Sequence, residues 1–165
     1  MSSFDVIEKQ LDLFSGHNPG FAREEAGLVR LIRAVDKQVT DRANLQLRRF
    51  GLSMSEYNTL TMMDPAGHGV SVSELVARTG EKPSNITRLT DQLLKKGLIK
   101  RYINEDDRRV WMVSLSDAGI DLLDQIIPYI SDQLHKVFMH VPADQRVAME
   151  QSLKVLLTSL ASEPI

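Results

Sequence analysis

Residues 83–116 read PSNITRLTDQLLKKGLIKRYINEDDRRVWMVSLS, and they carry the pattern from which the rest of the fold can be inferred. Apolar residues recur at helical spacing in its first part, and Pro83 and Gly97 mark the expected start and stop of that helix. Residues 98–103 and 110–115 are two strand-like runs joined by a short charged segment. The stretch therefore predicts a helix followed by a β-hairpin with a charged tip.

A second predicted helix lies just before this stretch, over residues 72–79. Ser71 and Glu74 have the spacing of a capping box, and Gly80 provides the stop signal. Two short helices joined by about four residues that include a glycine are typical of a helix-turn-helix. Together with the hairpin they predict a winged helix, in which the second helix starts without a good cap because Lys82 is a poor N-cap.

The polar face of the second helix and the hairpin tip carry side chains that suit duplex DNA. Short polar side chains on a helix in the major groove reach base edges, and an arginine on a neighbouring hairpin can enter the minor groove. The residues predicted to contact DNA are Ser84, Asn85, Thr87, Arg88 and Gln92 on the helix, and Arg108 and Arg109 on the hairpin. We expect Asp107 and the acids before it to orient these arginines through bidentate ion pairs.

Charge is distributed unevenly along the chain, although the formal net charge is only −2. Residues 82–109 contain eight basic and four acidic residues, and the rest of the chain is net negative. A local positive field can neutralise DNA phosphates, while an acidic remainder discourages indiscriminate binding. The distribution therefore favours a nucleic-acid partner for this segment.

Long helical patterns flank the winged helix on both sides. One is predicted over residues 22–50 and ends at Gly51; the others cover residues 116–161, with a break at Pro142 and a kink at Pro128. Their apolar stripes are too long to bury within one subunit, which predicts a homodimer. The fold class is therefore mainly α with a small β-hairpin wing (α+β). Its predicted parts are an N-terminal arm at 1–20, dimerisation helices at 21–50 and 116–165, and a winged helix-turn-helix DNA-binding domain at 51–115.

Two longer patterns in this region carry a family resemblance. They are Leu89-Thr90-Asp91-Gln92-Leu93-Leu94-Lys95-Lys96-Gly97-Leu98-Ile99-Lys100-Arg101 and Asp107-Arg108-Arg109-x-x-x-Val113-x-Leu115-Ser116-x-x-Gly119. Together they look like the signature of the MarR (multiple antibiotic resistance regulator) family. The resemblance extends over about residues 22–161 when the flanking helices are included, and it is closest to the subgroup that controls multidrug efflux pumps.

The resemblance implies a homodimeric repressor whose terminal helices interleave and which binds a pseudo-palindromic operator in double-stranded DNA. It also implies a small-molecule effector, phenolic or anionic and aromatic, that releases the protein from DNA. In the family pattern an aspartate late in the recognition helix pairs with the second wing arginine, which here means Asp91 with Arg109. A serine or threonine usually caps the recognition helix in this family, and Lys82 departs from that pattern.

The predicted DNA contacts have simpler alternatives. Charge clusters such as residues 107–109 often form a solvated hairpin tip, and the polar residues of the second helix could be an ordinary exposed face. Trp111 shares strand parity with Val113 and Leu115, so we expect it to pack beneath the wing and not to stack on bases. The order of helix-turn-helix and hairpin is what favours DNA binding over these alternatives.

An effector pocket is the least specific of these predictions. Met54, Tyr57 and Met62 are its candidate residues, with Met63 beside them. Methionine and aromatic residues at helical spacing more often fill a core, and we favour that interpretation for all four.

Several classes of function lack their signatures in this sequence. There is no cysteine, so disulfides and thiol chemistry are excluded, and nucleophile-elbow, P-loop and dinucleotide motifs are absent, so we expect no enzyme and no cofactor. No run approaches the roughly 18 apolar residues of a membrane span, and the first residues lack the order of a signal peptide. These features predict a cytoplasmic protein without a membrane partner.

A metal site is not predicted either, because the four histidines are scattered. His135 and His140 are five residues apart, which places them on different faces of a helix, and His17 and His68 are remote in sequence. A metal-dependent regulator and a winged-helix module that binds protein remain the alternative functions.

Overall fold

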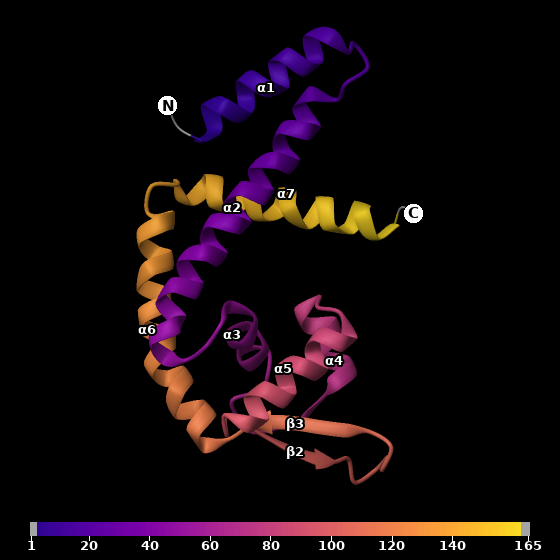
Figure 1. Cartoon of the computed structure of the whole chain (residues 1–165), viewed down its shortest axis with the longest axis vertical. Helices are drawn as coiled ribbons and strands as arrows, with labels where there is room; N and C mark the ends of the chain where they lie inside the picture. The colour runs from indigo at the N-terminus through magenta and orange to yellow at the C-terminus, as the bar shows by residue number, and fades with distance from the viewer. Residues whose placement is uncertain (1–2, 163–165) are drawn as a thin grey trace. The chain divides into compact units, whose positions relative to one another are not determined.

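The computed structural model describes residues 3–162, most of them helical (Figure 1). Contacts within the chain group it into one unit that ends at Leu123 and a second that begins at Asp124. The elements are α1 (Ser3–His17), α2 (Arg23–Leu47), η1 (Arg48–Phe50), α3 (Met54–Thr61), β1 (Val70–Ser71), α4 (Val72–Thr79), α5 (Pro83–Lys95), β2 (Ile99–Ile103), β3 (Trp111–Leu115), α6 (Asp117–Phe138) and α7 (Ala143–Ser162).

The predicted N-terminal arm is a helix, α1, that packs against α2. Leu11 is buried against Gly27, where an added Cβ would lie 3.6 Å from a Leu11 methyl group. An ion pair of 2.6 Å joins Asp12 to Arg23 across the two helices. The small residue at position 27 therefore lets the two helices approach, and the exposed ion pair adds little stability by itself.

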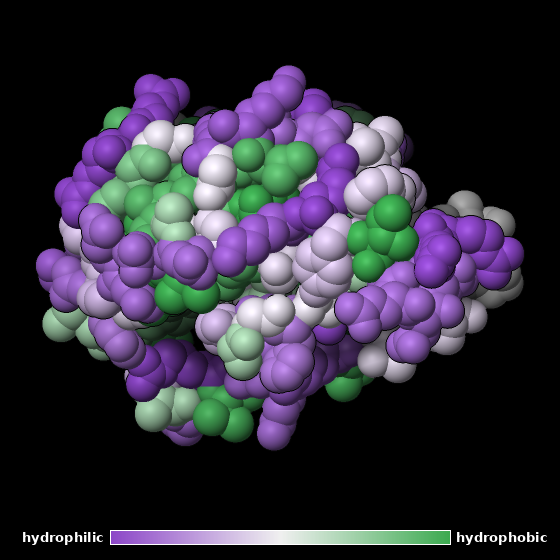
Figure 2. Space-filling model, turned by 90° about the horizontal axis from the view of Figure 1, so that it is seen from below, coloured by the Kyte–Doolittle hydropathy of each residue, from purple (hydrophilic) through white to green (hydrophobic). Residues whose placement is uncertain are grey.

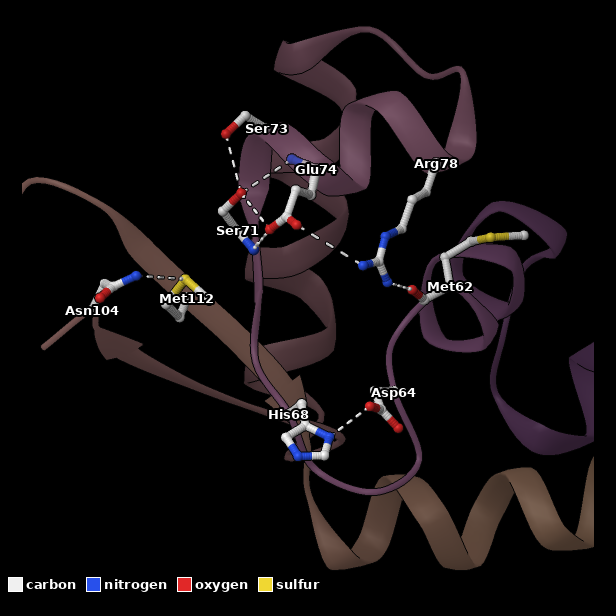
Figure 3. A network of polar contacts seen from close by, with 9 residues as sticks. All are labelled: Met62, Asp64, His68, Ser71, Ser73, Glu74, Arg78, Asn104 and Met112. Carbon is white, nitrogen blue, oxygen red and sulfur yellow. Dashed lines mark hydrogen bonds and ion pairs between the residues drawn. The ribbon is translucent and has the colours of Figure 1, made fainter. Parts of the chain in front are cut away.

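The Ser-x-x-Glu patterns at Ser53 and Ser71, which predict capping boxes, both form them in the structure. The Ser53 hydroxyl accepts from the backbone N–H of Glu56, and the Glu56 carboxylate accepts from the backbone N–H of Ser53 at 2.8 Å. Ser71 and Glu74 repeat the arrangement at the start of α4, as Figure 3 shows. The helix predicted over residues 22–50 corresponds to α2 and η1. It ends at Gly51 as predicted, where the backbone adopts a left-handed φ of 70° that favours glycine.

The connection between α3 and α4 is fixed by side chains of α4 and of the loop itself (Figure 3). Arg78 of α4 donates a 2.9 Å hydrogen bond to the backbone carbonyl of Met62 and lies 4.0 Å from Glu74. In the loop, the carboxylate of Asp64 accepts from the backbone of Ala66 and contacts the ring of His68 at 2.7 Å. These contacts hold the first helix of the helix-turn-helix in place against α3.

The sheet is antiparallel, in the order β1-β3-β2. The two strands of the predicted hairpin are confirmed, with Ile99 opposite Leu115 and Ile103 opposite Trp111. Strand β1 is only two residues long and runs directly into α4, so its sequence shows no alternation that could have predicted it. Helices α3, α4 and α5 lie with the hairpin around one core (Figure 1). Its fully buried residues include Leu60, Leu75, Ile86, Leu89, Leu93 and Val113.

The Ser116-x-x-Gly119 part of the sequence pattern joins the end of the hairpin to α6. The Ser116 hydroxyl donates to the backbone carbonyl of Gly97 at 2.6 Å and accepts from the backbone N–H of Gly119 at 3.0 Å. Ser116 thus caps α6 and anchors it to the turn that follows α5. A Cβ at position 119 would lie 2.1 Å from the carbonyl oxygen of Leu98, so only glycine fits.

The second unit consists of the rest of α6 and of α7. Ile126 and Ile130 of α6 are buried, and α6 continues through Pro128 without a break in its helical assignment. The chain turns before Ala143, next to the predicted break at Pro142. No described residue of α7 is buried, and its exposed apolar side chains are Val147, Met149, Leu153, Val155, Leu156, Leu157 and Leu160. Within residues 3–162, no helix combines the length and apolarity that a membrane crossing requires.

Candidate nucleic-acid interface

Helix α5 has one buried and one exposed face. It starts at Pro83, and the preceding Lys82 supplies no side-chain cap, as its sequence predicts. Ile86, Leu89, Thr90 and Leu93 are buried, and the Thr90 hydroxyl donates to the carbonyl of Ile86 within its own helix. The predicted DNA-contacting residues of this helix lie on the other face: Ser84, Thr87, Arg88 and Gln92 are exposed, and Asn85 is half-buried.

A chain of hydrogen bonds fixes the longest side chain of this face. Arg88 donates from Nη2 to the amide oxygen of Asn85 at 2.6 Å and from Nη1 to that of Gln92 at 2.8 Å. Asn85 in turn donates to the carboxylate of Glu81 at 2.6 Å. The Arg88 guanidinium is therefore braced between two amides before any ligand binds, which reduces the conformational entropy that binding would remove.

The hairpin tip is an ordered turn built by two side chains. The Asn104 amide oxygen accepts from the backbone N–H groups of Asp106 and Asp107 at 2.8 and 3.4 Å, while its amide nitrogen reaches the sulfur of Met112 at 3.7 Å (Figure 3). The Asp107 carboxylate accepts from the backbone N–H of Arg109 at 3.0 Å. These bonds fix the backbone of the tip, so the arginines project from a defined turn.

The two tip arginines differ in their partners. Arg109 forms a bidentate pair with Asp107, from Nε at 3.1 Å and from Nη2 at 3.2 Å, and its side chain is 90% exposed. These hydrogen bonds from Arg109 lower the pKa of Asp107. Arg108 is exposed and has no ion-pair partner among residues 3–162. One guanidinium is therefore aimed by a carboxylate, and the other is not held by an ion pair within residues 3–162.

The predicted pair between Asp91 and Arg109 is wrong in this structure. Asp91 instead accepts a 2.7 Å hydrogen bond from Arg101, which also donates to Thr90 at 3.2 Å. Arg101 lies on β2 with the same parity as the buried Ile99, so its side chain points toward α5. Arg109 is held at the tip by the carboxylate two residues before it. Strand parity was the signal that could have identified Arg101.

Two predictions of core packing are also wrong. Trp111 is 52% exposed although Val113, on the same face, is fully buried, because the hairpin extends past the helices that cover its base. Met62 is 40% exposed at the end of α3, whereas Met63 is buried as predicted. Met54 and Tyr57 are half-buried, and burial raises the pKa of Tyr57. An effector pocket at these side chains stays a prediction.

An ion pair between a buried glutamate and a partly exposed lysine lies beside the exposed face of α5. Lys96 donates to the Glu56 carboxylate at 2.6 Å and to the backbone carbonyl of Gly51 at 2.7 Å. Burial alone would raise the pKa of Glu56, but the hydrogen bonds from Lys96 and Ser53 outweigh it and lower the pKa. The pair tethers the end of α5 to the start of α3. It forms part of a groove of about 490 Å³, which is lined by Ser53, Glu56, Arg88, Gln92, Lys95 and Lys96.

Metal-binding groups do not gather at this face. In the part of the chain that the structure describes, no three residues of the histidine, cysteine, aspartate and glutamate types are grouped to hold an ion. His68 contacts the carboxylate of Asp64, and hydrogen bonds from the backbone N–H of Ala66 and from His68 lower the pKa of that carboxyl. The exposed helix face and the arginine-bearing hairpin are the two features that offer ligand-binding groups side by side.

The helix-turn-helix, the hairpin beside it and the exposed polar face of α5 together define a winged helix-turn-helix protein. Residues 52–111 match the family model described as "MarR family". This part of the chain is therefore similar to the MarR family, as the resemblance of its hairpin pattern implied. The flanking helices lie outside the matched residues, but similarity to individual proteins extends over them.

Similarity to individual proteins covers most of the chain. It is 28% identical over 160 residues to the transcriptional repressor MprA of Escherichia coli, an alignment that includes 96% of this chain and 91% of that protein. Its fold resembles AbsC of Streptomyces coelicolor, with a TM-score of 0.78, 20% identity, and 87% and 98% of the two chains covered. It also resembles S. aureus MepR in a complex with DNA, with a TM-score of 0.74, 20% identity, and 79% and 96% coverage.

Proposed function

We propose that this chain is a sequence-specific DNA-binding transcriptional regulator, and that it acts as a repressor. The observation that carries the proposal is the exposed face of α5, on which Arg88 is braced by Asn85 and Gln92 beside an arginine-tipped hairpin. The names of two similar proteins support it, because one is a transcriptional repressor and the other was solved bound to DNA.

In the proposed complex, α5 enters the major groove and the hairpin tip enters the adjacent minor groove. Arg88 presents a planar fork of the kind that reads the O6 and N7 atoms of guanine, with Asn85 placed for neighbouring bases. Arg109 reads the narrow groove mainly by its shape and negative potential. Lys95 is exposed at the end of the same helix and supplies positive charge for phosphates.

The proposed regulator is a homodimer. In a single subunit, helix α2 exposes the apolar side chains of Leu28, Ile32 and Val35. Helix α7 also exposes apolar side chains, and none of its described residues is buried. Apolar faces of this extent on flanking helices suit burial against a second copy. Two recognition helices would then lie about one DNA turn apart, roughly 34 Å, and read a pseudo-palindrome.

A small phenolic or anionic aromatic effector is proposed to release the protein from DNA. Met54, Tyr57 and Met62 of α3 remain its candidate contacts, since they carry adaptable or aromatic side chains that are not fully buried. Such a ligand must bind more tightly to a dimer conformation whose recognition helices cannot span the operator than to the DNA-binding conformation. A ligand with equal affinity for the two conformations would not change their equilibrium.

Selection of duplexes from a random-sequence library tests the proposal. We expect the protein to enrich a pseudo-palindrome and to bind it as a dimer, with affinity that falls steeply as salt increases. Arg88→Ala should relax the base preference, whereas Arg109→Ala should weaken binding to enriched and scrambled duplexes alike and lower the salt slope by about one. Affinity that does not depend on salt, or a stable protein complex without DNA affinity, would contradict the proposal. Binding abolished by chelator and restored by one metal would favour the metal-dependent alternative.

A further inference from the structure

Two large apolar side chains lie exposed on the hairpin between its base and its charged tip. Ile103 and Trp111 are directly opposite each other on β2 and β3, and they are 46% and 52% exposed. Hydrophilic residues cover most of the surface seen from the hairpin side, with hydrophobic patches between them (Figure 2). Single exposed apolar residues are ordinary, but a paired aromatic and aliphatic side chain on a projecting hairpin offers a contact surface.

Strand parity determines which way this pair faces. Arg101 and Val113 share its side of the sheet, and that side faces the helices, because Val113 is fully buried and Arg101 reaches Asp91 of α5. The pair therefore lies on the helix-facing side of the hairpin, one step beyond the ion pair with α5. The loop that holds Arg109 follows directly after it.

We infer that Ile103 and Trp111 contact the sugar–phosphate backbone of duplex DNA, on the strand that separates the two grooves. This inference rests on the proposed function. If α5 occupies the major groove and the tip occupies the adjacent minor groove, the backbone between the grooves crosses the hairpin face that lies between them. Deoxyribose rings supply apolar surface for this face. The indole N–H of Trp111 makes no hydrogen bond with any residue that the structure describes, and it can donate to a phosphate oxygen.

The charges around the pair favour a polyanion over an apolar protein surface. Arg88 and Lys95 lie exposed on α5 on one side. At the tip on the other side, Arg108 and Arg109 lie exposed beside Glu105, Asp106 and Asp107, and Asp107 is paired with Arg109. Apolar side chains between cationic groups match the alternation of sugar and phosphate along a DNA strand. The Ile103–Trp111 pair would thus continue the proposed interface from the helix to the tip.

Trp111 is the single tryptophan of the chain, so its emission reports on the contact directly. The duplex enriched from a random-sequence library and a scrambled duplex are added to the full-length protein, and binding is followed independently by the anisotropy of a label on the DNA. We expect a change of tryptophan emission, and protection from acrylamide quenching, that saturate together with the anisotropy.

Substitutions add a functional readout. Trp111→Leu should weaken binding to both duplexes by about tenfold and leave the salt slope unchanged, because no charge is removed. Trp111→Phe, which keeps the ring, should lose less. Tyr102→Leu is the matched control, since Tyr102 is a 41% exposed aromatic residue on the neighbouring strand β2 and on the opposite face of the hairpin. It should change affinity by no more than about twofold.

The outcomes separate the inference from the function on which it rests. DNA binding with unchanged tryptophan emission, or with equal loss in the Trp111 and Tyr102 variants, overturns the inference and leaves the proposed function standing. No anisotropy change at low salt with either duplex overturns both. An emission shift that follows protein concentration without DNA would assign the pair to contact between two copies, and would also overturn the inference.

Discussion

Arg101 of β2 donates a hydrogen bond from Nη2 to the carboxylate of Asp91 on α5 over 2.7 Å. The bond links the wing to α5, and Thr90 accepts a second one from the same nitrogen at 3.2 Å. The arginine side chain is 26% exposed, so the pair is only partly screened by solvent. The orientation of the wing relative to the helix therefore depends on Asp91 and Arg101, and Arg109 is left available at the tip.

A double-mutant cycle tests this assignment. Asp91→Asn and Arg101→Met should couple by about 1 kcal/mol in urea unfolding, since each variant removes the same hydrogen bond. Asp91→Asn and Arg109→Ala should be additive to within about 0.3 kcal/mol. Coupling found with Arg109 and not with Arg101 would show that Asp91 pairs with Arg109 in solution.

Gly119 gives a prediction about the junction between the hairpin and α6. A Cβ there would lie 2.1 Å from the backbone carbonyl oxygen of Leu98, which cannot move without disturbing the Ser116 cap. Gly119→Ala should lower the unfolding free energy by about 2 kcal/mol, despite the better helix propensity of alanine. Gly16→Ala is the control, because it lies in helix α1 with nothing within 4 Å of the added Cβ. It should stabilise slightly, by about 0.5 kcal/mol, and thermal melts of both variants would show the opposite signs.

Local signals in the sequence predicted most of the fold. The two capping boxes, Pro83, Gly51 and Gly97 act within one or two turns of the chain, and all of them lie at helix ends in the structure. Strand β1 was missed because two residues carry no periodicity, and its pairing with β3 depends on contacts distant in sequence. The sequence pattern is sufficient to predict an element whose own residues determine it, such as a capped helix. It is not sufficient for an element, such as β1, that forms only by pairing with a distant strand.

The candidate site was predicted less completely than the fold. The sequence identified the polar residues of α5 and the tip arginines as candidates, but it paired Asp91 with the wrong arginine and buried Trp111. Strand parity could have corrected the first error, since it places Arg101 on the face that meets α5. The second error concerns how far the hairpin extends past the helices, which strand parity cannot give. Parity places Trp111 and Val113 on one face, yet 52% of the tryptophan is exposed while the valine is fully covered.

Glu56 gives the fold a predictable dependence on pH. Its pKa is lowered in the folded protein from an ordinary 4.5, with hydrogen bonds from Lys96 and Ser53 outweighing burial. The stabilisation is therefore present above the unfolded pKa and is lost as the pH falls through the folded value. Glu56→Gln should be less stable than the unmodified protein by roughly 1–2 kcal/mol near neutral pH, with screening at the partly exposed Lys96 favouring the lower figure.

The difference should shrink below about pH 4.5. Glu150→Gln is the matched control, since Glu150 pairs with Lys154 on an exposed helix face and its pKa is lowered by that lysine. It should change stability little at any pH, because exposed pairs are screened. Urea unfolding of the three proteins across the acid range measures both effects, and a Glu56 difference that grew toward low pH would contradict the ion-pair account.

Asp107 separates orientation from simple charge at the wing. Replacing any acid of the tip makes the hairpin more positive, so electrostatics alone predicts tighter DNA binding for every such variant. Glu105→Gln should follow that rule, because Glu105 is exposed and has no ion-pair partner among residues 3–162. Asp107→Asn should not, because it also breaks the bidentate pair that aims Arg109. We expect the Asp107 variant to bind several-fold more weakly than the Glu105 variant on the same duplex at the same salt, although both carry the same net charge. Equal affinities would mean that Asp107 contributes only its charge and that Arg109 binds DNA equally well without the ion pair that orients it.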